Sequence, residues 1–146
     1  MGRIEEFTQF RTRMNEKILA ANHRATKRFF GIDTLTYEPD ALDRRTKELL
    51  ALVASLVLRC DDCVTYHLLE CRKLGVSDAE LRDALSVGLT VGGSIVIPHL
   101  RRAYAVMEEA GACGAAQPAD VRAGRAVRAQ AGRRHATKRT GDHGPR

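Results

Sequence analysis

The chain of 146 residues has no apolar run long enough to span a bilayer. Its longest uncharged stretches cover residues 49–58 and 84–98, whereas a membrane helix needs roughly 18–20 apolar residues. Residues 1–20 also lack the positively charged start and apolar segment of an export signal, because charged and apolar residues are interleaved there. We therefore expect no membrane partner and a cytoplasmic location.

No segment shows the two-residue alternation of a β-strand, and no internal repeat is visible. Apolar residues instead recur at three- and four-residue steps, which is typical of helices. One such stripe, from Ile4 to Phe29, predicts a long first helix that ends near Gly31 and is followed by a connection over residues 32–39. The sequence therefore predicts an all-α domain with about five main helices.

Capping residues divide the rest of the domain into four further helices. Asp40 is placed to cap a second helix, whose apolar second half we expect to be surrounded by protein. A third helix begins near Cys60 and ends in a cationic turn followed by Gly75. Ser77-Asp78-Ala79-Glu80 is a capping box for a fourth helix, and a fifth runs from about residue 94 or 98 to residue 110.

Basic residues predominate beyond residue 113. Residues 1–113 contain 16 Lys and Arg against 16 Asp and Glu, whereas residues 114–146 contain 8 against 2, so the formal net charge of +6 lies in the tail. The tail has no Leu, Ile, Met or aromatic residue to bury. We predict a domain over residues 1–113 and a basic, disordered tail over residues 114–146. We favour a solvated charged end over a nucleic-acid contact, because no aromatic side chains interleave for base stacking.

Two thiols and an imidazole share one short stretch, Cys60-Asp61-Asp62-Cys63-Val64-Thr65-Tyr66-His67. In a helix, Cys63 and His67 are i,i+4 neighbours, so the imidazole can take the thiol proton. Cys60 lies one turn earlier, within reach of a disulfide. Glu48, twelve residues before Cys60 on a separate helix, could orient His67 through its other ring nitrogen. The stretch therefore offers a nucleophile, a base and a resolving thiol.

At these spacings, Glu48, the Cys60-x-x-Cys63 pair and His67 resemble the signature of the alkylhydroperoxidase D-like branch of the carboxymuconolactone decarboxylase family. The resemblance extends from about residue 39 to residue 111 and includes the turn at residues 74–81 and the Val-Gly-Gly stretch at residues 91–93. Better-known members of the family often carry a histidine where this chain has Asp62.

The resemblance implies an all-α fold, a peroxide substrate, and a dithiol or protein-thiol reductant. It also implies a homo-oligomer, commonly a trimer or hexamer, and a proton relay from Glu48 and His67 to Cys63. The large amount of apolar helix in so small a chain also favours association with another subunit.

The chemistry of the thiols favours the same assignment of roles. A thiolate attacks the terminal peroxide oxygen, and a second thiol then condenses with the sulfenic acid to form a disulfide. Cys60 lies nearer the helix N-terminus, an effect worth about 0.3–1 kcal/mol, but Cys63 has a base beside it, typically worth about 10²–10⁴-fold. We therefore predict Cys63 as nucleophile and Cys60 as resolving thiol. Asp61 and Asp62 oppose thiolate formation unless solvent screens them.

Several other interpretations are open. A zinc site would need Glu48 or an outside ligand, because helical rise puts Cys71 about 16 Å from Cys60. The Cys-x-x-Cys pair could be buried structural cysteines with an incidental histidine, and we expect Cys71 and Cys113 to be structural or incidental. A lactone decarboxylase of the same fold needs no thiol pair, and a redox-sensing or nucleic-acid-associated binding protein would use the disulfide as a switch. We predict a thiol-dependent hydroperoxide reductase or disulfide oxidoreductase with neither metal nor cofactor.

Overall fold

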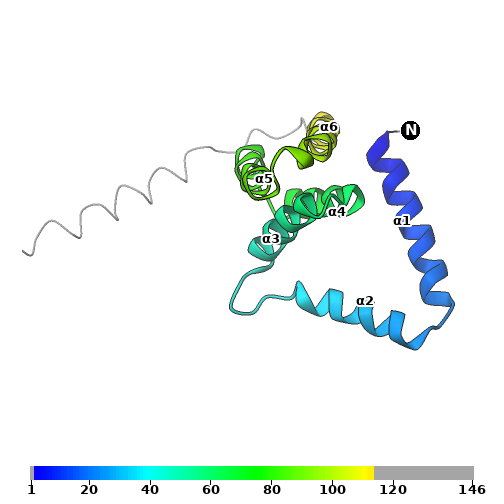
Figure 1. The fold of residues 1–146 in the computed structure, drawn as a ribbon. Helices are drawn as coiled ribbons and strands as arrows, with labels where there is room; N and C mark the ends of the chain where they lie inside the picture. Colours follow the sequence, from blue (N-terminus) through cyan, green and yellow to red (C-terminus); the bar gives the residue numbers. More distant parts are fainter. Residues whose placement is uncertain (1, 114–146) are drawn as a thin grey trace, which may run out of the picture. The chain divides into compact units, whose positions relative to one another are not determined.

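The computed structural model describes residues 2–113, so the predicted tail at residues 114–146 lies outside the described residues. The described part is entirely helical, without a strand, which confirms the all-α prediction. Its elements, shown in Figure 1, are α1 (Arg3–Ala20), α2 (Arg24–Thr36), α3 (Arg44–Val57), α4 (Asp61–Lys73), α5 (Asp78–Gly92), η1 (Ser94–Val96) and α6 (Ile97–Cys113). None of these helices is long and apolar enough to cross a membrane.

The core lies among α3, α4, α5 and α6. Helix α3 packs against both α4 and α5, and α6 packs against α4. Gly88 of α5 allows a close approach, since a Cβ atom there would lie 2.9 Å from the Leu56 side chain. The buried apolar residues are Leu52, Leu56, Val64, Leu68, Cys71, Val76, Leu81, Leu85, Val96, Ala103, Val106 and Met107. This core holds α3 and α4 in the mutual position that the functional site requires.

The prediction of one long first helix is wrong. The chain breaks between α1 and α2 at Asn22, which adopts a left-handed backbone with φ of 57°. Asn tolerates this conformation better than most residues, and the ring of His23 then caps α2 by accepting a hydrogen bond from the Thr26 backbone amide at 3.4 Å. The apolar stripe continues through the break, so periodicity alone concealed it. Neither helix contains a buried residue.

The predicted N-cap of the next helix is displaced by three residues. Asp43, not Asp40, caps α3 by accepting a hydrogen bond from the Thr46 backbone amide at 2.7 Å. Asp40 instead lies in the preceding bend, where its amide donates to the carbonyl of Leu42 at 3.0 Å. The later caps agree with the prediction: Gly75 adopts φ of 75° after α4, and both hydrogen bonds of the α5 capping box are present.

Candidate functional site

The two cysteines lie at the start of α4, where the chain turns sharply out of α3. Arg59 takes a left-handed φ of 59°, and Cys60 then becomes the N-cap residue of α4. The Cys60 sulfur accepts a hydrogen bond from the Cys63 backbone amide at 3.3 Å. Cys60 and Cys63 are joined as a disulfide, with their Cα atoms 5.2 Å apart. The turn therefore places both sulfurs together at a partly buried helix N-terminus.

Glu48 and His67 form a buried pair between α3 and α4. His67 Nδ1 lies 2.8 Å from Glu48 Oε2, and the two residues are only 9% and 1% exposed. A carboxylate at such depth is costly without a partner. Donation from Nδ1 to Glu48 leaves Nε2 as the ring nitrogen that is free to accept a proton.

An ion pair with Arg44 lies at the other carboxylate oxygen of Glu48. Arg44, one turn earlier on α3, places its Nε 3.7 Å from Glu48 Oε1 and its Nη2 3.2 Å from Glu70 Oε2. Glu48 Oε1 is itself buried without a hydrogen-bond partner among the described residues. Arg44 was not predicted to contact Glu48, although the i,i+4 spacing of the two residues was the available signal.

Two tyrosines surround the His67 ring. The ring centroids of Tyr37 and Tyr66 lie 5.5 Å and 5.1 Å from that of His67. Burial raises the pKa of both phenols, with Glu48 adding to the rise for Tyr37 and Glu70 for Tyr66, so their hydroxyls stay protonated near neutrality. Neither tyrosine was predicted to contact His67. Tyr37 comes from another segment, so its contact with His67 leaves no spacing signal in the sequence.

A cavity of about 380 Å³ opens on this site. Cys63 and His67 both line it, whereas Cys60 is not among its lining residues. Helix α1 supplies the apolar wall through Phe7, Phe10, Met14 and Ile18, and the guanidinium of Arg11 lies 4.0 Å above the Tyr66 ring. The structure thus brings together the four predicted residues, with Cys63 and His67 facing the same space.

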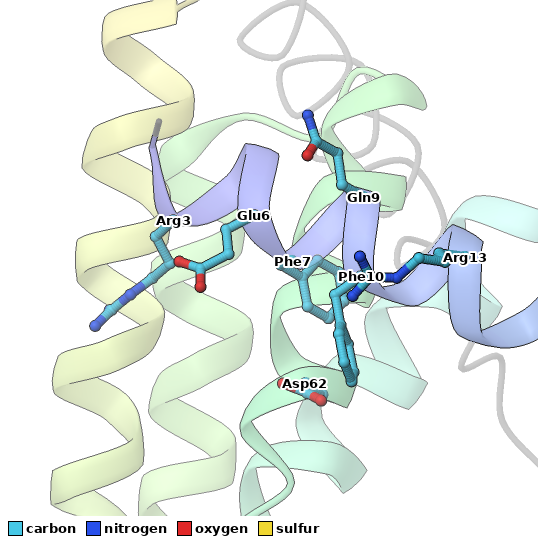
Figure 2. Close-up of a pocket in the computed structure, with 7 residues that line it drawn as sticks. All are labelled: Arg3, Glu6, Phe7, Gln9, Phe10, Arg13 and Asp62. Carbon is cyan, nitrogen blue, oxygen red and sulfur yellow. The ribbon is translucent and has the colours of Figure 1, made fainter.

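A second cavity of about 510 Å³ adjoins the first and shares Phe7, Phe10 and Asp62 with it. Figure 2 shows the rings of Phe7 and Phe10 directed from α1 toward Asp62 of α4, while Gln9 points the other way. The two cavities together extend the space beside Cys63 along α1.

The carboxylates between the two cysteines have different surroundings. Asp62 is exposed, so solvent screens its charge. Asp61 is not screened by solvent alone, because it accepts a hydrogen bond from His99 Nδ1 at 2.8 Å and forms an ion pair with Arg102 Nη1. The charge of Asp61 is therefore offset by protein groups on α6 as well as by solvent.

The remaining thiol within the described core is inert. Cys71 is 0% exposed, and burial, assisted by the charge of Glu48, raises its pKa to about 12. It therefore packs as a small apolar residue. The Cys113 side chain lies outside the described part of the structure. Among residues 2–113, no group of three or more His, Cys, Asp or Glu side chains is placed to hold a metal ion.

Comparison with known proteins matches residues 23–109 to the carboxymuconolactone decarboxylase family. A Paracoccus denitrificans protein described as uncharacterized protein 4 in cox locus is 27% identical over 81 residues, which cover 56% of this chain and 73% of the relative.

Solved structures show the same similarity. A crystal structure of a Thermotoga maritima protein is 50% identical, with a TM-score of 0.75 over 77% of this chain and 99% of its own. A second structure of that protein is 54% identical, with a TM-score of 0.68 over 71% and 88%, and its description places it in this family with a suggested involvement in antioxidative response. A family protein from Legionella pneumophila, 23% identical with a TM-score of 0.68 over 73% and 96%, shares the fold.

Proposed function

Since the chain belongs to the carboxymuconolactone decarboxylase family, we propose that it reduces hydroperoxides with the Cys60–Cys63 pair. The observation that carries this proposal is the shared cavity of Cys63 and His67, with His67 held by the buried Glu48 at 2.8 Å. A nucleophile, a base and a group that orients the base are the parts that an activated thiol requires. The Thermotoga maritima relative's suggested antioxidative role supports the same chemistry.

In the first half-reaction, His67 Nε2 takes the proton of the Cys63 thiol. The thiolate attacks the terminal oxygen of the hydroperoxide, so that an S–O bond forms while the O–O bond breaks. The departing alkoxide takes a proton and leaves as an alcohol, and Cys63 is oxidised to a sulfenic acid. Glu48 stabilises the imidazolium while it carries the proton.

In the second half-reaction, the Cys60 thiol attacks the sulfenic sulfur of Cys63. The S–S bond forms and the oxygen leaves as water. The two cysteines need no large backbone movement to form this bond, since their Cα atoms are 5.2 Å apart, within the usual range for a disulfide. An external dithiol then reduces the disulfide by thiol–disulfide exchange and is itself oxidised.

The assay for this function follows the loss of a hydroperoxide in the presence of a dithiol such as dithiothreitol. We expect multiple turnovers per chain. Formation of a single disulfide without turnover would instead indicate a redox-sensing protein. Absence of both, together with lactone decarboxylation, would indicate the other chemistry of this fold.

We also propose that the protein functions as a homo-oligomer, through the apolar surface between α3 and α5. A groove of about 680 Å³ there is lined only by uncharged side chains. Among them Leu50, Leu58, Val87 and Val91 are 56%, 75%, 54% and 70% exposed. The absence of charge from the groove favours a second copy, with the same apolar surface, over a charged partner.

Replacing Leu50 and Val91 together by lysine should therefore shift the protein to a smaller species in size-exclusion chromatography with light scattering. The desolvation of two ammonium groups opposes burial of this surface. Asp83→Lys is the control, because Asp83 is exposed on α5 but does not line the groove. A wild-type protein that is monomeric at micromolar concentration would contradict the proposal.

A further inference from the structure

We propose that Arg102 and His99 of α6 are positioning residues that compensate the charge of Asp61 and so keep the Cys63 thiol acidic enough to react. The proposal deepens the thiol chemistry proposed above and depends on it. It concerns the cluster formed by Asp61, His99 and Arg102, which lies beside the cysteine pair and outside the Glu48–His67 pair.

The cluster places one arginine and one histidine of α6 on the two oxygens of one carboxylate. His99 Nδ1 donates to one carboxylate oxygen of Asp61 at 2.8 Å, and Arg102 Nη1 donates to the other oxygen. Asp61 is partly buried, at 35% exposure of its side chain, and His99 is more buried, at 19%. Both oxygens of the carboxylate are therefore engaged by α6, from residues 38 and 41 positions further along the chain.

Asp61 lies between the two thiols in sequence, directly after Cys60 and two residues before Cys63. An uncompensated negative charge near a thiol disfavours the thiolate. A cation bonded to the same carboxylate cancels most of that field, so Arg102 protects the thiolate without contacting the sulfur. Asp62 offers the contrast: it is exposed and forms no ion pair in the described part of the chain.

A purely structural role makes a different prediction. Asp61 is in the first turn of α4, where an acidic residue also favours the helix. If the cluster only tethered α4 to α6, removing either partner would loosen the same contact and alter the thiol in the same direction. Charge compensation instead requires opposite effects from Asp61 and Arg102.

The experiment measures the rate of iodoacetamide alkylation of Cys63 against pH in the reduced full-length chain, with Cys60 and Cys113 replaced by serine. Cys71 is left in place because it is buried. The charged and titratable groups around Cys63 are the same in every variant apart from the tested ones. They are Asp62 and His67 of α4, Glu48 of α3, and Arg11 and Asp33, which line its cavity from α1 and α2.

Arg102→Gln should raise the apparent pKa of Cys63 by about half a pH unit, which slows alkylation near neutrality about threefold. Asp61→Asn should lower that pKa by a similar amount and accelerate alkylation. The Asp61→Asn/Arg102→Gln double variant should return close to the wild-type profile, because the anion and the cation that offsets it are then both absent. His99→Leu, which removes the N–H donor to Asp61, should act in the direction of Arg102→Gln.

Arg101→Gln is the matched control, since it removes a cation from the neighbouring position of α6 and forms no ion pair in residues 2–113. We expect it to leave the profile unchanged. Shifts of the same sign in Asp61→Asn and Arg102→Gln, or no shift in either, would overturn the proposal. Alkylation requires no peroxide, so a failure of the proposed function would appear separately, as a wild-type chain without peroxide turnover.

Discussion

Replacing Cys63 by serine should abolish peroxide consumption, whereas replacing Cys60 by serine should leave one oxidation per chain and a sulfenic acid on Cys63 that a dimedone-type reagent can trap. The reason is the different surroundings of the two sulfurs. Cys63 shares the cavity with His67, while Cys60 is not among the residues that line it. Without Cys60, the first half-reaction can proceed but no second thiol is available to condense with the product.

The opposite result would reverse the two roles. A sulfenic acid on Cys60 in the Cys63→Ser variant, with Cys60→Ser inert, would mean that the helix N-terminus activates the attacking thiol rather than His67. The hydrogen bond from the Cys63 amide to the Cys60 sulfur, at 3.3 Å, would then stabilise the thiolate. Cys71→Ala is the control for general loss of thiols, because Cys71 is buried and its pKa is about 12.

The second large effect concerns the Glu48–His67 pair. His67→Ala should slow alkylation of Cys63 near neutral pH by about 10- to 100-fold, as expected if the pKa of the thiol rises by about one to two pH units without its base. Glu48→Gln should keep the fold and slow alkylation less or equally, because an amide preserves a hydrogen bond without stabilising imidazolium. The double variant should be little slower than the slower single variant, since groups that act as one unit are non-additive.

The measurement uses reduced protein with Cys60 and Cys113 replaced by serine, and it follows the rate from about pH 6 to pH 9. The alkylation rates of all variants should converge toward high pH, where hydroxide deprotonates the thiol directly.

Cys71 sets the upper limit of the pH range that can be used. Its folded-state pKa of about 12 lies above the model-compound value of 9.0, so the unfolded chain loses that proton first and stability falls as pH rises above about 9.

Arg45→Gln is a matched control on α3. Arg45 follows Arg44 in sequence but forms its ion pair with Glu80, at 2.6 Å, away from the Glu48–His67 pair. It should leave the alkylation profile of Cys63 unchanged. Additive losses from Glu48→Gln and His67→Ala would contradict the relay, and unchanged rates in both would leave Cys63 without the base that the account assigns to it.

Helix ends and spacings within one helix could be predicted from the sequence, because local signals determine them. Helices α4 and α5 were predicted from capping residues close to their ends, such as Gly75 and Ser77, and the structure confirms these caps. The i,i+4 spacing of Cys63 and His67 similarly follows from helix geometry once α4 is recognised. The start of α3 was predicted wrongly, with the cap at Asp40, because the chain bends there and the helix begins only after Asp43.

The features that the sequence did not reveal come from contacts between distant segments. Tyr37 reaches His67 from the end of α2, and Arg102 reaches Asp61 across 41 positions of sequence. Neither contact has a local spacing signal. The break at Asn22 was missed for a different reason, since the apolar stripe continues in phase on both sides of it.

The central claim is that Cys60 and Cys63 form one redox pair that hydroperoxide oxidises. Mass spectrometry of the reduced protein after one equivalent of hydroperoxide tests it most directly. We expect the loss of two hydrogens per chain and a peptide in which Cys60 and Cys63 are joined, and we expect dithiothreitol to reverse both changes. Two free thiols after this treatment, or Cys63 carrying sulfinic acid while Cys60 stays reduced, would contradict it.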